Sequence, residues 1–448
     1  MDRPLAPLTD ALLEAAKTAG ADAADAVALE GTSISIDVRA GALEQAERSE
    51  SIDVGLRVMI GQRQACVSSS ETTAETFAEM AARAVAMARE APEDPGVMLA
   101  PTARLAREID MTALDLLDPA DEPAPADLEA RARTAEASAL AHQGISMVEA
   151  ASCGYSSRRV HLATSAGFSA GYGRTDSAIF CVAITGSGTE MERDYFGESR
   201  THRADLPSPE EVGRIAAERT LARAGARKPP TGPAPILYDE RIASGLIGHL
   251  VAAANGASIV RGASWLSEAM GEEVLPKGLS LLEEPRRTRV SGSRLYDGEG
   301  LPTATRALVE DGVLQSWILD LSTAAKLGLD STANASRSVS APPSPSAGNL
   351  RLTQGDASRE ALLSQMGTGL LLTSLIGATI NPTTGDYSRG ASGFWVENGE
   401  VAYPVNECTI AGNLREMLRT IVPANDARPH LGRVVPSLLV EGLTIAGA

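Results

Sequence analysis

Hydrophobic residues in the first half of the chain follow two different periods. Helical spacing predicts amphipathic helices, and it occurs in residues 7–20, 75–90, 127–142 and 208–225. Alternation of apolar and polar residues predicts half-buried antiparallel strands, and it occurs in residues 33–69, 160–173 and 177–190. Thr72 and Glu75 have the spacing of a capping box before the second helix. These patterns indicate a mixed α/β unit.

The second half of the chain is rich in strand patterns. Asp311-Gly312 and Asn398-Gly399 each separate two apolar-alternating runs. Such pairs predict type I′ hairpin turns, because both central residues of that turn need positive φ. Residues 331–349 contain too much Ser, Pro and Asn for regular structure, so we expect a long ordered loop or a lid. Residues 413–421 predict a short helix.

A proline-rich segment separates the two halves. Residues 226–235 contain four prolines in ten positions, which is typical of a domain boundary. We therefore expect an α+β protein in which an N-terminal α/β domain over residues 1–225 precedes a β-rich domain over residues 236–448.

The longest uncharged stretch raises a separate question. Residues 242–260 contain no Asp, Glu, Lys or Arg, although 22% of the chain is charged. Its glycines and polar residues, among them Ser244, His249 and Asn255, are unfavourable in a membrane span. The pattern favours a helix buried inside a soluble protein, with His249 as a satisfied core residue.

Composition excludes some functions. The formal net charge of −18 repels phosphate backbones, so we expect no nucleic-acid partner. The N-terminus lacks a basic region followed by an apolar one, so no signal peptide is predicted, and we expect no membrane association. The four cysteines lie far apart without a CxxC motif, which favours reduced thiols and a cytoplasmic location.

The usual catalytic motifs are weak. Gly167 to Gly171 match G-x-S-x-G around Ser169, but both flanks are strand-like, so we expect a hairpin turn instead of a nucleophile elbow. No two of the five histidines lie within five residues of each other, which excludes HExxH and its relatives. A metal site could still be assembled from distant residues.

Four long strings carry a family resemblance. Residues 244–266, 296–300, 331–345 and 373–418 closely resemble the TldD/PmbA family, and within it the PmbA branch, also called TldE. The resemblance implies a mixed α/β N-terminal domain followed by a β-barrel-like C-terminal domain.

The family's active branch consists of zinc peptidases with an H-E-x-x-x-H helix and a later cysteine ligand. Aligned on Arg261 to Ser264, this chain has Ile247 and Ala252 at the histidine positions and Gly248 at the glutamate position. Leu431, which follows His430, stands near the cysteine position. A register that starts at His249 puts Leu250 and Ala254 at the remaining positions. Either register predicts no catalytic residue, metal or cofactor in this chain, and zinc in a partner.

Three hypotheses remain, and the resemblance supports the first two. The first is the non-zinc subunit of an intracellular metalloprotease that degrades or processes unfolded peptides, paired with a TldD-like zinc subunit in a heterodimer or larger complex. The alternative is a homodimeric peptide-binding or scaffold protein without catalysis. The third is an independent hydrolase that uses Ser169 or an assembled metal site. Substrate or interface contacts are expected from His249, Asn255, Arg261, Asp297 and Arg389, each of which could instead satisfy a loop backbone.

Overall fold

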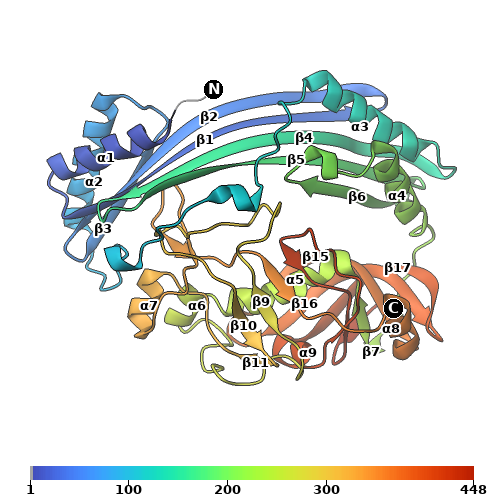
Figure 1. The fold of residues 1–448 in the computed structure, drawn as a ribbon. Coiled ribbons are helices and arrows are strands. Elements are labelled where there is room, and N and C mark those ends of the chain that lie inside the picture. The colour runs from blue at the N-terminus through green and yellow to red at the C-terminus, as the bar shows by residue number, and fades with distance from the viewer. Residues whose placement is uncertain (1–3, 448) are drawn as a thin grey trace.

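The N-terminal half is built on one long antiparallel sheet. The structure is a computed structural model that describes residues 4–447. The sheet has the strand order β3-β2-β1-β4-β5-β6, and its strands arch over the C-terminal half (Figure 1). The strand bounds are β1 Ala23–Arg39, β2 Ala42–Ile60, β3 Arg63–Ser69, β4 Ile145–Thr164, β5 Ser169–Thr185 and β6 Glu192–Arg200.

Two pairs of helices cover opposite ends of this sheet (Figure 1). They are α1 Ala6–Thr18 with α2 Ala74–Glu90, and α3 Pro125–Leu140 with α4 Pro209–Leu221. All four predicted helices are therefore confirmed. The predicted capping box was wrong in register, because Thr73 is the N-cap residue and its Oγ1 accepts from the backbone N–H of Thr76 at 3.1 Å.

The alternation of side chains along β1 explains how one face of the sheet packs against the helices and the other face against the C-terminal half. Ala26 and Ala28 pack in the core beneath α1 and α2, and Ile34 and Ile36 pack beneath α3 and α4. Val27 belongs to a different cluster, which contains the C-terminal residues Tyr296 and Leu301. Because successive side chains point to opposite faces of a strand, β1 joins both helix pairs to the second domain.

The C-terminal half contains a curled half-barrel sheet, as the expected α+β fold requires. Its strand order is β18-β20-β8-β15-β16-β17-β21-β7. The bounds are β7 Gly232–Pro233, β8 Ile236–Tyr238, β15 Gly369–Ile380, β16 Asp386–Glu397, β17 Glu400–Asn413, β18 Val422–Pro423, β20 Leu438–Val440 and β21 Thr444–Ala446.

A second, smaller sheet lies beside the half-barrel in the order β11-β10-β9-β14-β19. Its bounds are β9 Leu281–Glu283, β10 Arg306–Glu310, β11 Val313–Leu314, β14 Leu350–Leu352 and β19 Arg433–Val434. The helices of this half are α5 Glu240–Ala253, α6 Gly256–Val260, α7 Leu321–Leu327, α8 Arg359–Met366 and α9 Leu414–Arg419.

Both predicted hairpins are confirmed. Asp311 and Gly312 join β10 to β11 with φ of 46° and 83°, and Asn398 and Gly399 join β16 to β17 with φ of 55° and 81°. The G-x-S-x-G segment is also a hairpin connection, because β4 ends at Thr164 and β5 begins at Ser169.

The proline-rich segment 226–235 is attached to the C-terminal half. Gly232 and Pro233 form β7, which pairs with β21, and Arg227 forms a β-bridge with Val405. These contacts hold the segment against the half-barrel sheet.

The Ser/Pro loop over residues 331–349 is ordered and contacts both halves. Its short strands β12 Ala335–Ser336 and β13 Ser344–Pro345 pair with each other. Arg337 in this loop forms an ion pair with Asp25 of β1, with 2.9 Å between Nε and Oδ1. Val339 lies so close to Gly55 of β2 that a Cβ there would collide with its backbone. The loop therefore connects the arched sheet to the C-terminal domain.

The uncharged stretch is helical, as expected, but it forms two helices, and only one face of α5 is buried. Its residues form most of α5 and all of α6, with Asn255 as the N-cap of α6. Leu246, Ile247 and Leu250 are fully or almost fully buried in the C-terminal core. Within residues 4–447, no helix has the length and apolar character needed to cross a membrane.

Candidate functional site

Helix α5 presents two different faces. Leu246, Ile247 and Leu250 point into the core, whereas Gly245 and Ala252 are exposed. Neither Ile247 nor Ala252 has a side-chain atom that can bind a metal ion, so α5 supplies no metal ligand from these two positions.

An arginine fills the space beside Gly248. A Cβ on Gly248 would lie 3.0 Å from Nη1 of Arg433 in β19. The sequence predicts that Gly248 occupies the glutamate position of the family's zinc peptidases. A fixed guanidinium charge opposes a second cation nearby, and the repulsion increases as the local dielectric constant falls. The site is therefore electrostatically unfavourable for zinc.

Leu431 contributes no ligand atom from its side chain. Its carbonyl oxygen accepts a hydrogen bond from Nη1 of Arg287 at 2.9 Å. Cys408, the other C-terminal candidate, donates from Sγ to the carbonyl of Ala391 at 3.2 Å. Burial raises the pKa of Cys408 to about 11, so it is a thiol at neutral pH. Within residues 4–447, no group of three or more His, Cys, Asp or Glu side chains could hold a metal ion.

His249 and Arg389 are brought together on the half-buried side of α5. The His249 ring packs edge-to-face on Tyr387, with 5.7 Å between ring centroids. Burial lowers the pKa of His249, and the positive charge of Arg389 lowers it further, so the imidazole is neutral at pH 7. In the described part of the chain, the buried Nε of Arg389 has no hydrogen-bond partner.

The remaining sequence candidates lie apart from this pair. Asn255 caps α6 through Oδ1 and donates from Nδ2 to the carbonyl of Pro345 at 2.9 Å. Asp297 is 2% exposed, and its carboxylate accepts from the backbone N–H groups of Glu299, Leu301 and Ala335. These contacts give Asn255 and Asp297 structural roles. Arg261 is exposed, and its Nη2 donates to Ser258 Oγ at 3.4 Å.

Ser169 lacks the surroundings of a hydrolase nucleophile. Its Oγ lies 3.5 Å from Nε2 of His161, and Nδ1 of that ring contacts the hydroxyl of Thr9 at 2.9 Å. A catalytic triad needs a carboxylate at the second position, to orient and stabilise the charged imidazole. Burial lowers the pKa of His161, which leaves the ring neutral at pH 7.

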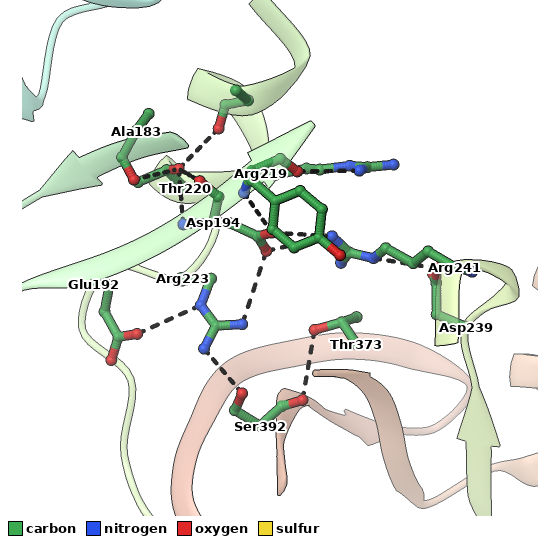
Figure 2. Close-up of polar contacts among 12 residues, drawn as sticks. Ala183, Glu192, Asp194, Arg219, Thr220, Arg223, Asp239, Arg241, Thr373 and Ser392 are labelled. Atoms are coloured by element: carbon green, nitrogen blue, oxygen red, sulfur yellow. Dashed lines mark hydrogen bonds and ion pairs between the residues drawn. The ribbon is translucent and has the colours of Figure 1, made fainter. Parts of the chain in front are cut away.

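A cavity of about 640 Å³ separates the first turns of α5 from the end of the arched sheet. Asp194 of β6 lies at its edge between two guanidinium groups (Figure 2). Arg241 Nη1 donates to Asp194 Oδ1 at 3.2 Å, and Arg223 Nη1 lies 3.8 Å from Oδ2. Arg223 also donates from Nη2 to Ser392 Oγ of β16 at 3.0 Å. The network fastens β6 to α5 and to the half-barrel.

A second carboxylate of β6 makes similar contacts. Arg428 Nη1 lies 2.8 Å from Glu198 Oε1, and His430 Nε2 lies 3.4 Å from Oε2. Burial alone would raise the pKa of Glu198, but His430, Arg200 and Arg428 overcome this effect and lower it to about 2. We call Asp194, Glu198 and their partners Arg223, Arg241 and Arg428 the β6 seam.

Sequence reasoning missed Arg433 and the β6 seam. Arg433 lies two residues after Leu431, but nothing in the sequence indicates that it reaches α5. Asp194 and Arg241 are 47 residues apart and have no shared pattern. Among the described residues, the groups available here for binding are guanidinium groups, amides and backbone atoms. These residues contain neither a catalytic triad around Ser169 nor a cluster of metal-binding side chains.

These features define an α+β protein whose long sheet arches over a half-barrel and its helix α5. Family models for PmbA/TldA metallopeptidases match nearly the whole chain: domain 1 at residues 24–88, the central domain at 118–224 and the C-terminal domain at 231–447. The chain belongs to the PmbA/TldD family.

Similar proteins agree with this assignment. The metalloprotease PmbA of Escherichia coli O157:H7 is 35% identical, over 95% of this chain and 92% of the relative. A PmbA homologue of Haemophilus influenzae is 33% identical, over 97% and 94%. A solved structure from Bacteroides thetaiotaomicron, named as a proposed modulator of DNA gyrase, has a TM-score of 0.90 at 25% identity, and covers 99% of this chain and 98% of that one.

TldE from Thermococcus kodakarensis has the same fold, with a TM-score of 0.85 over 98% of this chain and 100% of that one, at 19% identity.

Proposed function

We propose that this chain is the non-zinc subunit of a TldD/TldE-type metalloprotease and supports a zinc-bearing TldD-like partner. The observation that carries the proposal is the set of side chains on and beside α5. Ile247 is fully buried, neither Ile247 nor Ala252 has a ligand atom, and Arg433 lies beside Gly248. The relatives named metalloprotease support a role in proteolysis, and in this proposal the zinc belongs to the partner.

The substrate in this proposal is an unfolded peptide. An extended peptide binds to a sheet mainly through main-chain hydrogen bonds, which tolerates varied sequences. The chain would supply walls and access to the partner's zinc site. We place the complex in the cytoplasm, a location supported by four cysteines that are all free in the described structure.

The test compares the chain alone, a TldD-like partner alone, and both after mixing. Zinc is measured by elemental analysis, assembly by light scattering, and activity with an unfolded, uncharged fluorogenic peptide. We expect no stoichiometric zinc and no hydrolysis from this chain alone, and chelator-sensitive hydrolysis after mixing that exceeds that of the partner alone. Zinc-dependent activity of the isolated chain would overturn the proposal.

Two controls separate the remaining hypotheses. Ser169→Ala should leave the hydrolysis by the mixture unchanged, whereas its loss would favour an independent serine hydrolase. A stable homodimer that binds peptides but neither binds nor stimulates the partner would overturn the subunit proposal in favour of a scaffold.

A further inference from the structure

A second cavity between the two domains is lined by arginines. It has a volume of about 500 Å³, and among the described residues its lining includes five arginines and no acidic side chain. They come from β4, β5, two loops and β19: Arg158, Arg174, Arg294, Arg337 and Arg433. We call this cavity the arginine pocket. It is unexpected in a chain whose formal net charge is −18.

Most of this positive charge is not neutralised by ion pairs. Arg337 is paired with Asp25 at 2.9 Å, and Arg174 lies 3.8 Å from Asp176. Within residues 4–447, the guanidinium groups of Arg158, Arg294 and Arg433 make no ion pair. Arg158 and Arg294 interact with carboxylates only at longer range, with Asp176 and Asp297, where they oppose the rise in pKa that burial causes. Like charges held together repel each other, so a bound anion would stabilise this arrangement.

Two of the arginines also have unused hydrogen-bonding capacity. Nε of Arg294 and Nη2 of Arg337 are buried and have no partner among the described residues. The Arg337 side chain is only 2% exposed. Buried polar atoms are nearly always hydrogen-bonded in native proteins, so each exception needs an explanation.

The chemistry of the pocket selects oxyanions. Guanidinium groups bind carboxylates and phosphates through paired hydrogen bonds, which adds geometric specificity to the charge attraction. The volume falls in the range of small-ligand sites, which suits a short chain segment better than a folded surface. Arg433 reaches from this pocket to Gly248, so the pocket adjoins the outward face of α5.

The geometry points to a binding site for the side-chain carboxylates of an acidic peptide segment. This inference rests on the proposed function, in which the chain handles unfolded peptides, and it adds a preference for acidic sequence. The pocket lies between β4, β5 and the C-terminal loops, so a peptide held there would lie along the arched sheet.

Calorimetry on the purified full chain provides the direct test. The probes are a Glu-rich hexapeptide with blocked ends, the same peptide with Gln in place of Glu, and inorganic phosphate. We expect the acidic peptide to bind at least tenfold more tightly than the Gln peptide, with affinity that falls as salt rises. Equal binding of the two peptides would overturn the inference. Binding of phosphate without the acidic peptide would also overturn it, because the pocket would then be a site for free small anions.

The matched variants are Arg158→Gln with Arg433→Gln in the pocket, and Arg214→Gln outside it. Neither pocket guanidinium makes a described hydrogen bond or ion pair, so the double variant should fold normally, which thermal unfolding checks. Arg214 pairs only with Glu218 on the exposed face of α4. We expect the double variant to bind the acidic peptide at least tenfold more weakly and Arg214→Gln to bind it normally. Unchanged binding by a folded double variant would refute the assignment.

The experiments distinguish a failure of this inference from a failure of the proposed subunit function. Hydrolysis of an uncharged peptide by the mixed complex tests the subunit role and does not depend on the pocket. A complex that is active on uncharged peptide but shows no acidic binding refutes only this inference. Acidic binding without stimulation of a partner refutes only the subunit role.

Discussion

The β6 seam and the arginine pocket both lie between the two domains, but they treat charge in opposite ways. In the seam, buried carboxylates are paired with arginines: Asp194 meets Arg241 of α5 from the other half and Arg223 from its own half. In the pocket, arginines converge without an acidic residue in the lining. Paired charges fix two domains together, whereas unpaired charges of one sign are available to a ligand. Pairing thus distinguishes a structural junction from a binding site.

The largest expected effect comes from breaking the seam at Asp194. Asp194→Ala removes one of the two carboxylates paired with each of Arg223 and Arg241, which keep Glu192 and Asp239. We therefore expect a loss of about 2–3 kcal/mol in the free energy of unfolding. Urea denaturation measures it. Asp330→Ala is the control, because the Asp330 side chain is 91% exposed in its pair with Arg104. If Asp194→Ala lowered the free energy of unfolding no more than Asp330→Ala does, the ion pairs of the β6 seam would contribute no more than an exposed surface pair.

A smaller, pH-dependent effect is expected at Glu198. Its folded-state pKa of about 2 lies below the usual value, so its ionised form stabilises the folded state. This contribution is complete above the unfolded pKa of about 4.3 and is lost as the pH falls through the folded pKa. We expect Glu198→Gln to cost about 1–2 kcal/mol at pH 7, with the difference from wild type narrowing below pH ~4. Denaturation at several pH values checks this, and a constant difference would contradict it.

Binding of a ligand in the arginine pocket should increase the free energy of unfolding, because most of the positive charge in the pocket is not already neutralised by ion pairs. An acidic peptide at ten times its Kd should raise the free energy of unfolding by about 1.4 kcal/mol through mass action. Thermal unfolding with and without the peptide measures this effect. The Arg158→Gln, Arg433→Gln variant at the same peptide concentration should show little of it, and an equal shift in that variant would place the binding elsewhere.

The smallest effect is expected from the same double variant without ligand. Because neither guanidinium has a described partner, its loss should change the free energy of unfolding by no more than about 0.5 kcal/mol. Slight stabilisation would follow from reduced like-charge repulsion. Urea denaturation of this double variant and of Asp194→Ala, under the same conditions, compares the two losses of stability. A loss above about 2 kcal/mol in the double variant would show that the pocket is a structural junction too.

Local patterns predicted the local structure well. The four N-terminal helices, the hairpins at Asp311-Gly312 and Asn398-Gly399, and the buried helix around Ile247 follow from periodicity and turn chemistry. The error at Thr72 is one of register, because adjacent threonines offer the same cap and only the backbone decides that Thr73 supplies it. The family was also recognisable from long strings of residues.

The candidate site was predictable only in part. The sequence predicted that Ile247, Gly248, Ala252 and Leu431 stand where the family's zinc chemistry would be. It gave no indication that Arg433 lies beside Gly248, since the two residues are far apart along the chain and belong to different elements. The formal net charge of −18 likewise gave no indication of a pocket lined by arginines.

The sequence by itself determined the elements, the turns and the family, because these depend on residues that are close together along the chain. The tertiary structure alone decided which charges meet. The five pocket arginines lie in the second, third and fourth quarters of the chain and converge only when the arched sheet closes over the C-terminal domain. Electrostatic interactions depend on distance in space, so the difference between the β6 seam and the arginine pocket exists only in the folded molecule.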